Sequence, residues 1–185
     1  MDVYGSRFRY PLNSGHEFAA QVVSVGDRVT SISPGQRVTG HSQWVQFGGA
    51  FAEYLLVPEA DRNLISVESS AKANNYSVIE PDLVTLIEPL TVALQALDRS
   101  EEITSTKVKS LPKLVIVGSG TIGLSVLLAA QTRGYNNIVV SEPSPLRRKI
   151  AESIGAITVD PSGPEGIDRL RSVVSRCPGK TGDGA

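Results

Sequence analysis

Short apolar runs alternate with stretches of helical periodicity from residue 113 to near the end of the chain. Two buried runs and a shorter third one predict strands, and three periodic stretches predict helices. The expected strands span residues 114–117, 137–141 and 157–159, and the expected helices span residues 121–133, 145–154 and 166–175. Alternation of strand and helix at this spacing predicts a parallel sheet with right-handed crossovers.

The first part of the chain has a different pattern, in which strand-forming runs are closed by glycine and proline. Strands are expected over residues 18–25, 37–39 and 51–57. Turn signals at Gly26-Asp27, Pro34-Gly35 and Pro58 follow or separate these runs. Short strands punctuated in this way predict a small barrel-like or sandwich-like β domain.

The stretch between these two patterns contains helices and a connection. Residues 66–80 are polar and poorly periodic, and are expected to form a loop. A helical stretch is expected over residues 80–88, followed by a helix over residues 89–97, and then by a charged segment rich in Ser and Thr. The predicted organisation is therefore a domain over residues 1–97, a connection over residues 98–112 and a second domain over residues 113–185.

Composition narrows the classes of function. Of the 185 residues, 41% are hydrophobic and 20% are charged, and the net charge of −1 gives no electrostatic case for a nucleic-acid partner or an acidic membrane surface. No apolar run is long enough to span a membrane, and the first residues lack the pattern of a signal peptide. A single cysteine, Cys177, excludes an internal disulfide and a cysteine-rich zinc lobe, and favours a reducing, cytoplasmic location.

A glycine-rich turn joins the first expected strand of the second domain to its first helix. Residues 118–123 read Gly-Ser-Gly-Thr-Ile-Gly, which matches G-x-G-x-x-G in the strand–turn–helix context of a dinucleotide-binding domain. Gly118 would permit the tight turn, Gly120 the approach of a pyrophosphate, and Gly123 close packing of the helix on the strand. The candidate cofactor-binding residues of this segment are Gly118, Gly120, Thr121, Ile122 and Gly123. The alternative is a tight connection that binds nothing.

A carboxylate follows the second strand of the same domain. Glu142 lies about twenty residues beyond the last glycine, where an acidic side chain accepts hydrogen bonds from both hydroxyls of an adenosine ribose. Because it would repel a 2′-phosphate, NAD is predicted over NADP. Arg147 and Arg148 follow closely and soften that preference, and Arg147 is included among the candidate cofactor-binding residues. The alternatives are a solvated charge for Glu142 and, as the favoured interpretation, a solvated helix face for the arginines.

Several further segments, in a fixed order, extend the pattern over nearly the whole chain. Residues 15–19 read Gly-His-Glu-Phe-Ala, residues 48–54 read Gly-Gly-Ala-Phe-Ala-Glu-Tyr, and residues 87–90 read Ile-Glu-Pro-Leu. With residues 22–26 and 34–38 and the glycine turn, they resemble the zinc-dependent medium-chain dehydrogenase/reductase superfamily of alcohol and polyol dehydrogenases. Residues 140–145, Val-Ser-Glu-Pro-Ser-Pro, are similar to the branch that acts on butanediol, sorbitol and related vicinal diols.

The resemblance implies a fold and an activity. The first domain would be a partial GroES-like all-β domain. The second would be an incomplete α/β Rossmann domain, the first half of a doubly wound parallel sheet. The implied activity is that of an oxidoreductase, which transfers hydride from a secondary alcohol or vicinal diol to NAD, so that the expected partner is a small-molecule alcohol or polyol. The alternative is a catalytically incomplete fragment, or an NAD-binding or partner-binding protein derived from that family.

The resemblance also implies a catalytic zinc ion. His16 matches the histidine ligand of the family, Glu17 the adjacent glutamate, and Glu88 a third, carboxylate position. Zinc bound there would act as a Lewis acid on the alcohol oxygen. Asp2 matches an aspartate that orients the histidine. The alternatives are a histidine satisfied near the surface of a barrel and, for Glu88, a carboxylate that stabilises a helix N-terminus.

Departures from the family pattern leave enzymatic activity open. If Asp2 aligns as above, the ligand cysteine and the proton-relay hydroxyl of the family fall at or before Met1, so no catalytic residue is assigned and zinc affinity is expected to be poor. Residues 183–185 resemble the start of the fourth Rossmann strand, which leaves only the first half of the cofactor domain. A half sheet exposes an edge at its first strand, and this predicts a homo-oligomer or pairing with a second chain through that edge.

Overall fold

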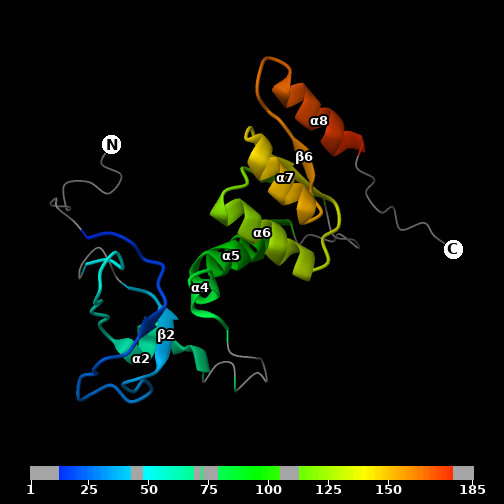
Figure 1. Cartoon of the computed structure of the whole chain (residues 1–185). Helices are drawn as coiled ribbons and strands as arrows, with labels where there is room; N and C mark the ends of the chain where they lie inside the picture. Colours follow the sequence, from blue (N-terminus) through cyan, green and yellow to red (C-terminus); the bar gives the residue numbers. More distant parts are fainter. Residues whose placement is uncertain (1–12, 43–47, 69–71, 73–78, 105–112, 177–185) are drawn as a thin grey trace, which may run out of the picture. The chain divides into compact units, whose positions relative to one another are not determined.

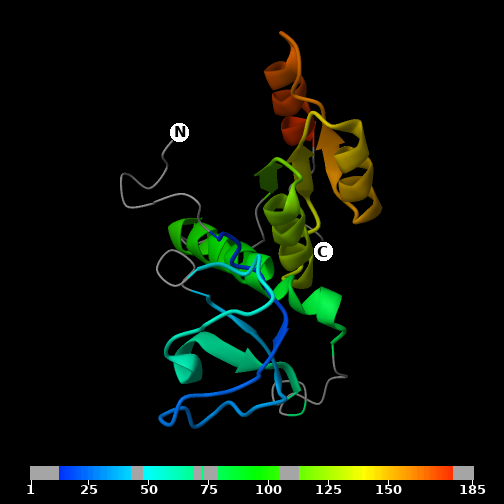
Figure 2. The same ribbon diagram turned by 60° about the vertical axis from the view of Figure 1, so that its left-hand side comes forward.

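The computed structural model of the protein describes residues 13–42, 48–68, 72, 79–104 and 113–176 (Figure 1). The chain divides into two units, Met1–Glu88 and Pro89–Ala185. Each unit contains a three-stranded sheet, and both sheets can be followed in the second view (Figure 2). The domain limits predicted from the sequence stay predictions.

The first unit is built on an antiparallel sheet. Its strands are β1 (Ala20–Gln21), β2 (Arg37–Gly40) and β3 (Leu64–Ser66), in that order across the sheet. Val38 of the central strand faces Ala20 on one side and Ser66 on the other. The short helices of this unit are α2 (Ala60–Asn63) and α4 (Pro81–Val84). Buried apolar side chains of the unit are Phe18, Ile32, Val38, Ala60, Val67 and Val84.

The strands predicted for this unit are only partly confirmed. Residues 37–39 lie in β2, but the strand expected over residues 18–25 is reduced to β1, and residues 51–57 form no strand. A strand-forming sequence becomes a strand only where a neighbour pairs with it. Within the part of the chain that the structure describes, the backbone pairing near this segment consists of hydrogen bonds donated by Ala50 and Phe51, at its beginning. The sequence pattern also fails to reveal β3, which is only three residues long.

Helix α5 (Ile87–Thr104) is longer than the sequence predicts. The helical stretch expected over residues 80–88 divides into α4 and the start of α5, and the helix expected over residues 89–97 continues through the first part of the predicted connection. Charged residues at helical spacing support this extension, as in the pair between Arg99 and Glu102 at 3.8 Å. No helix of the described residues, α5 included, is long and apolar enough to cross a membrane.

The second unit has a parallel sheet whose strands alternate with helices. The strands are β4 (Leu114–Val117), β5 (Ile138–Ser141) and β6 (Ile157–Val159), and the helices that follow them are α6 (Thr121–Thr132), α7 (Pro145–Ser153) and α8 (Gly166–Arg176). Each end lies within one residue of its predicted position. Both strand pairs are parallel, in the order β4-β5-β6, which confirms the predicted first part of a Rossmann sheet.

Apolar side chains cover both faces of the central strand of this sheet. Val139 and Val140 of β5 are adjacent in sequence, so they point to opposite faces, and both are buried. Val140 packs in a core that includes Leu127 of α6, whereas Val139 packs in a second core with Leu170 of α8. Burial from both sides fixes the strand ends, where the glycine turn and Glu142 lie.

Strand β4 lies at the edge of the sheet that the structure describes. Among the described residues it pairs only with β5, and its last residue, Val117, is 84% exposed. The exposed edge that the sequence predicts is therefore present in this part of the protein.

Candidate functional site

The glycine turn connects the carboxyl end of β4 to the amino end of α6. Gly118 has a φ of +93°, a backbone conformation that residues with a Cβ rarely adopt. Its N–H donates to the carbonyl oxygen of Ser141 at 2.7 Å, which ties the turn to the end of β5. Gly118 therefore permits the chain to reverse tightly between strand and helix.

Gly120 and Gly123 lack side chains for different physical reasons. A Cβ on Gly123 would collide with the carbonyl oxygen of Gly118, so α6 can approach the loop only through a glycine. A Cβ on Gly120, the N-cap residue of α6, would meet nothing within 4 Å. Its bare backbone leaves open space at the helix N-terminus, where Thr121 and Ile122 begin the helix and no side chain caps it. An uncapped helix N-terminus of this kind can bind a phosphate group.

The side chain of Glu142 links the glycine turn to the segment after β5. Its Oε2 accepts hydrogen bonds from the backbone N–H of Ser119 at 2.8 Å and from the Ser119 hydroxyl at 3.3 Å. Its Oε1 accepts one from the backbone N–H of Ser144 at 2.8 Å. Glu142 is only 4% exposed, so it is a held carboxylate rather than a solvated charge.

These hydrogen bonds favour the ionised form of Glu142. The N–H groups of Ser119 and Ser144 hold the pKa of the Glu142 carboxyl below its ordinary value, against the opposing effect of burial. The nearby guanidinium of Arg147 has a smaller effect in the same direction. A carboxylate has about four acceptor positions, and three are used here. One hydrogen bond from a ribose hydroxyl can therefore be added without breaking any of them.

The two arginines that follow Glu142 differ in their surroundings. Arg148 points inward, where its Nη1 donates to the carbonyl oxygens of Glu142 and Pro143 and pairs with Asp160 at 3.2 Å. Arg147 is exposed on α7. A solvated helix face thus describes Arg147 but not Arg148.

Ser119 and Ser144 hold the side chain of Glu142, and neither is among the candidate site residues that the sequence indicates. Ser144 is the N-cap residue of α7 and precedes Pro145, so the Ser-Pro pair at a helix start is a signal that could have found it. Ser119 occupies a variable position of the glycine motif. Its main contact is through the backbone N–H, which every residue except proline carries, so the sequence contains no signal for it.

In the first unit, two glycine-containing segments pair and hold the residues that precede the histidine. The N–H groups of Ala50 and Phe51 donate to the carbonyl oxygens of Gly15 at 2.9 Å and Ser14 at 3.0 Å. Gly49 permits this approach, because a Cβ there would collide with the backbone of Ser14. The Gly-His-Glu and Gly-Gly-Ala motifs, which are distant in sequence, therefore form one local structure.

His16, Glu17 and Glu88 come together beside this pairing. Nε2 of His16 lies 3.7 Å from Oε1 of Glu88, and one ligand atom from each of the three residues lies within 4.8 Å of the others. Glu88 is in the first turn of α5. Zinc bonds of about 2.0–2.2 Å in a tetrahedron place ligand atoms roughly 3.3 Å apart. A small rearrangement would therefore bring these three atoms onto one ion.

The donor set of this cluster, one imidazole nitrogen and two carboxylate oxygens, fits a divalent metal ion. His16 and Glu17 are exposed, so water or a substrate oxygen could reach the ion. Glu88 also lies where a carboxylate stabilises a helix N-terminus, which is the structural alternative for it. Asp2 and Cys177 lie outside the described residues.

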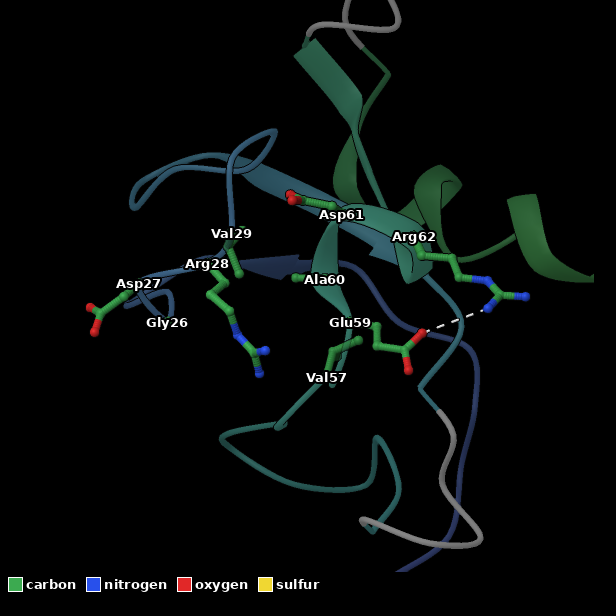
Figure 3. Close-up of a pocket in the computed structure, with 9 residues that line it drawn as sticks. All are labelled: Gly26, Asp27, Arg28, Val29, Val57, Glu59, Ala60, Asp61 and Arg62. Atoms are coloured by element: carbon green, nitrogen blue, oxygen red, sulfur yellow. Dashed lines mark ion pairs between the residues drawn. The ribbon is translucent and has the colours of Figure 1, made fainter.

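A hollow of the first unit lies between α2 and the turn that follows β1 (Figure 3). Two of its three carboxylates have partners. The hydroxyl and N–H groups of Ser31 and Thr30 donate to Asp61 at 2.6–3.1 Å and hold the pKa of its carboxyl far below the ordinary value. Glu59 pairs with Arg62 at 3.7 Å. We interpret this network as structural and assign it no ligand.

Known proteins resemble this chain in sequence and in fold. Residues 1–69 match the family described as alcohol dehydrogenase GroES-like domain. The chain is 32% identical to (R,R)-butanediol dehydrogenase of Bacillus subtilis (strain 168), over 94% of this chain and 50% of that protein. The crystal structure of 2R,3R-butanediol dehydrogenase from Bacillus subtilis matches with a TM-score of 0.68 at 28% identity, over 91% of this chain and 50% of that one. Zinc dependent alcohol dehydrogenase 2 from Streptococcus pneumonia shares the fold, with a TM-score of 0.70 at 23% identity over 91% and 51%.

The fold and the matches together define the class of protein: a GroES-like unit followed by the first strands of a Rossmann-like unit. The resemblance to the medium-chain dehydrogenase/reductase superfamily that the motifs predict is confirmed, since residues 1–69 match its GroES-like domain and the similar proteins are dehydrogenases. It spans about half the length of the curated relatives that it matches.

Proposed function

We propose that the chain binds the adenosine half of NAD at the turn of residues 118–123. The observation that carries this proposal is the open space at Gly120, which lies at an uncapped helix N-terminus and close to the buried carboxylate of Glu142. The pyrophosphate would accept hydrogen bonds from N–H groups at Thr121 and Ile122. A ribose hydroxyl would donate to Glu142, whose charge disfavours a 2′-phosphate, while exposed Arg147 attracts one. NAD is therefore the preferred cofactor and NADP the weaker one.

We further propose that His16, Glu17 and Glu88 hold a divalent metal ion, which family resemblance identifies as zinc. When bound, zinc supplies a Lewis acid for an alcohol oxygen. The protein contributes position: backbone pairing holds the segment before His16, and the start of α5 presents Glu88. The function supported best is that of an oxidoreductase which passes hydride from a secondary alcohol or vicinal diol to NAD. No residue of this chain is proposed as catalytic.

Titration with NADH, followed by the fluorescence of the nucleotide, tests the cofactor proposal. We expect saturable binding, and weaker binding of NADPH. Gly120→Val fills the open space and should abolish binding while the fold is retained. Gly26→Val is a matched control, because a Cβ at Gly26 also meets nothing within 4 Å. Failure of the unaltered chain to bind NADH, or equal binding by both variants, would overturn the proposal.

Calorimetric titration with Zn²⁺, with Co²⁺ absorption spectra as a second readout, tests the metal proposal. His16→Ala and Glu88→Gln should each weaken binding by about tenfold or more, the scale of a lost ligand or its orienting partner. His41→Ala is the matched control, since His41 is the other histidine of the chain and lies outside the cluster. Equal affinities in the His16 and His41 variants would refute this metal site.

The exposed edge of β4 supports a second candidate function, namely binding of another protein chain, with or without catalysis. The observation that favours it is the exposure of Val117 beside backbone groups that pair with no other strand of the described residues. Light scattering after size-exclusion chromatography should show a homo-oligomer that Val117→Lys dissociates. A monomer at every concentration argues against self-association.

A cytoplasmic location stays a proposal that rests on the single cysteine.

A further inference from the structure

Every polar group of Glu142 is held by a neighbour within the second unit. Its N–H donates to the carbonyl oxygen of Val159 at 3.0 Å, and its carboxylate accepts from Ser119 and Ser144. Its own carbonyl oxygen accepts from Nη1 of Arg148 at 2.7 Å. Arg148 is the one charged side chain in this set, and its bond to the carbonyl is charge-assisted, so it is the strongest of the contacts to the backbone of Glu142.

Arg148 is itself held in place from two sides. Its Nη1 donates to the carbonyl oxygen of Pro143 at 2.7 Å, and it pairs with Oδ2 of Asp160 at 3.2 Å. The side chain is only 18% exposed. Asp160 directly follows β6, and its Oδ1 accepts from the N–H of Ser162 at 2.9 Å. This series of bonds joins the carboxyl ends of β5 and β6 and restricts the guanidinium to one position.

We infer that Arg148 is a positioning residue, which fixes the backbone of Glu142 and thereby sets the preference for NAD over NADP. The inference rests on the proposed binding of NAD at the glycine turn. A carboxylate held in one place can accept from a ribose hydroxyl and exclude a 2′-phosphate. The same carboxylate on a loosened segment does both less well, because it can move aside. Arg147 has the opposite effect, since its exposed charge favours the 2′-phosphate.

The two adjacent arginines provide a matched experiment on the full chain, with NADH and NADPH as probes in fluorescence titrations. Arg148→Ala should weaken NADH binding about tenfold, the scale of one lost charge-assisted hydrogen bond. It should weaken NADPH binding less than about threefold, so that the preference for NADH falls. Arg147→Ala should raise the preference for NADH over NADPH, because it weakens the binding of NADPH alone. Arg148→Lys keeps the charge opposite Asp160 and should restore part of the preference.

Hydrogen exchange of individual backbone amides tests the positioning of Glu142 without any nucleotide. Arg148→Ala should speed exchange at Ser119 and Ser144 by about tenfold, because both amides donate to the Glu142 carboxylate, whereas Arg147→Ala should leave them unchanged. If Arg148→Ala does not fold, Asp160→Asn replaces it. That variant removes the charge of the pair, retains an acceptor oxygen, and should shift both readouts in the same direction by a smaller factor.

Three outcomes decide between the two proposals. If Arg148→Ala weakens both nucleotides equally, or neither, the positioning inference is wrong and the proposed NAD binding stands. If the unaltered chain binds neither nucleotide, the proposed function is wrong, and the inferred preference falls with it. If exchange at Ser119 and Ser144 is the same in the variant as in the unaltered chain, Arg148 does not position Glu142, whatever the chain binds.

Discussion

In the unit Pro89–Ala185 each strand of the sheet is followed along the chain by a helix. In the unit Met1–Glu88, the paired strands are instead separated by long stretches of sequence. β4, α6 and β5 are consecutive elements. In the other unit, by contrast, Val38 of β2 faces Ser66 of β3. A local arrangement leaves its period in the sequence, while a non-local one depends on partners that the local pattern does not contain. The first is therefore easier to predict.

The same contrast separates the two candidate sites. The candidate nucleotide site is formed by one βαβ segment, in which the glycine turn and Glu142 are joined by hydrogen bonds. The metal cluster brings residues 16 and 17 to Glu88, and it depends on a pairing of two other distant segments. A motif with a physical mechanism predicts the first site directly. The second could be recognised only through the ordered resemblance to a family.

The largest expected effect tests how rigid the local unit is. Gly123→Val places a side chain against the backbone of Gly118, where neither partner is a flexible group that can move aside. We expect the free energy of unfolding, measured by urea denaturation, to fall by about 3 kcal/mol or more. Gly120→Ala serves as the control, because its Cβ meets nothing within 4 Å, and it should change stability by less than about 1 kcal/mol. Similar losses in the two variants would mean that the turn can adapt, and would weaken the comparison.

The next effect tests which face of α6 the sheet buries. Leu127 is 0% exposed and its neighbour Leu128 is 45% exposed. Leu127→Ala should lower the free energy of unfolding by about 3 kcal/mol, as expected for a truncated core leucine. Leu128→Ala removes the same atoms from a half-exposed position and should cost less than about 1 kcal/mol. A large loss at Leu128 would show that this face is covered in solution, for example by another chain.

Much of the second unit could be predicted from the sequence, and the reasons are physical. The run of residues 138–140 is apolar throughout because both faces of this parallel strand are covered. Pro145 marks a helix start because it lacks an N–H that the first turn does not use. In the first unit, residues 51–57 have strand-forming side chains but no regular strand, because the decisive factor is the neighbour. Helix α5 was underestimated because its last turns carry charged residues typical of a connection.

Of the candidate nucleotide site, the sequence predicts the glycine turn and its carboxylate but not the contacts that hold them. The glycine motif and Glu142 follow from residue types and spacing, since a ligand must approach bare backbone there. The different environments of Arg147 and Arg148 could not be predicted, because they depend on which way each side chain leaves α7 and on Asp160 at the end of another strand. The contact of Ser119 through its backbone leaves no trace in the residue type.

A smaller effect tests the non-local contacts of the first unit. Asp61→Ala removes the acceptor that holds the N–H and hydroxyl groups of Thr30 and Ser31, residues that are distant in sequence. We expect a lower Tm in thermal unfolding followed by circular dichroism, because the N–H and hydroxyl groups of these exposed residues lose the charged acceptor that joins the two segments. Asp27→Ala is the matched control, since Asp27 lines the same hollow from the facing turn (Figure 3). Equal Tm values for the two variants would show that the Asp61 network adds nothing to stability.

The smallest effect concerns the pH dependence of the local unit, and it follows from Glu142. The amides of Ser119 and Ser144 lower the pKa of this carboxyl in the folded protein from an ordinary value of 4.5. A group whose pKa is lower when folded contributes stability that is fully present above the unfolded value and is lost as pH falls through the folded one. The urea midpoint of the unaltered chain should therefore fall more steeply than that of Glu142→Gln below about pH 4.5, while Glu165→Gln, at an exposed position, should keep the steep profile. If the urea midpoint of Glu142→Gln falls with pH as steeply as that of the unaltered chain, the amides of Ser119 and Ser144 do not hold the carboxylate in solution. The hydrogen bonds that distinguish this part of the second unit from the first would then lack support.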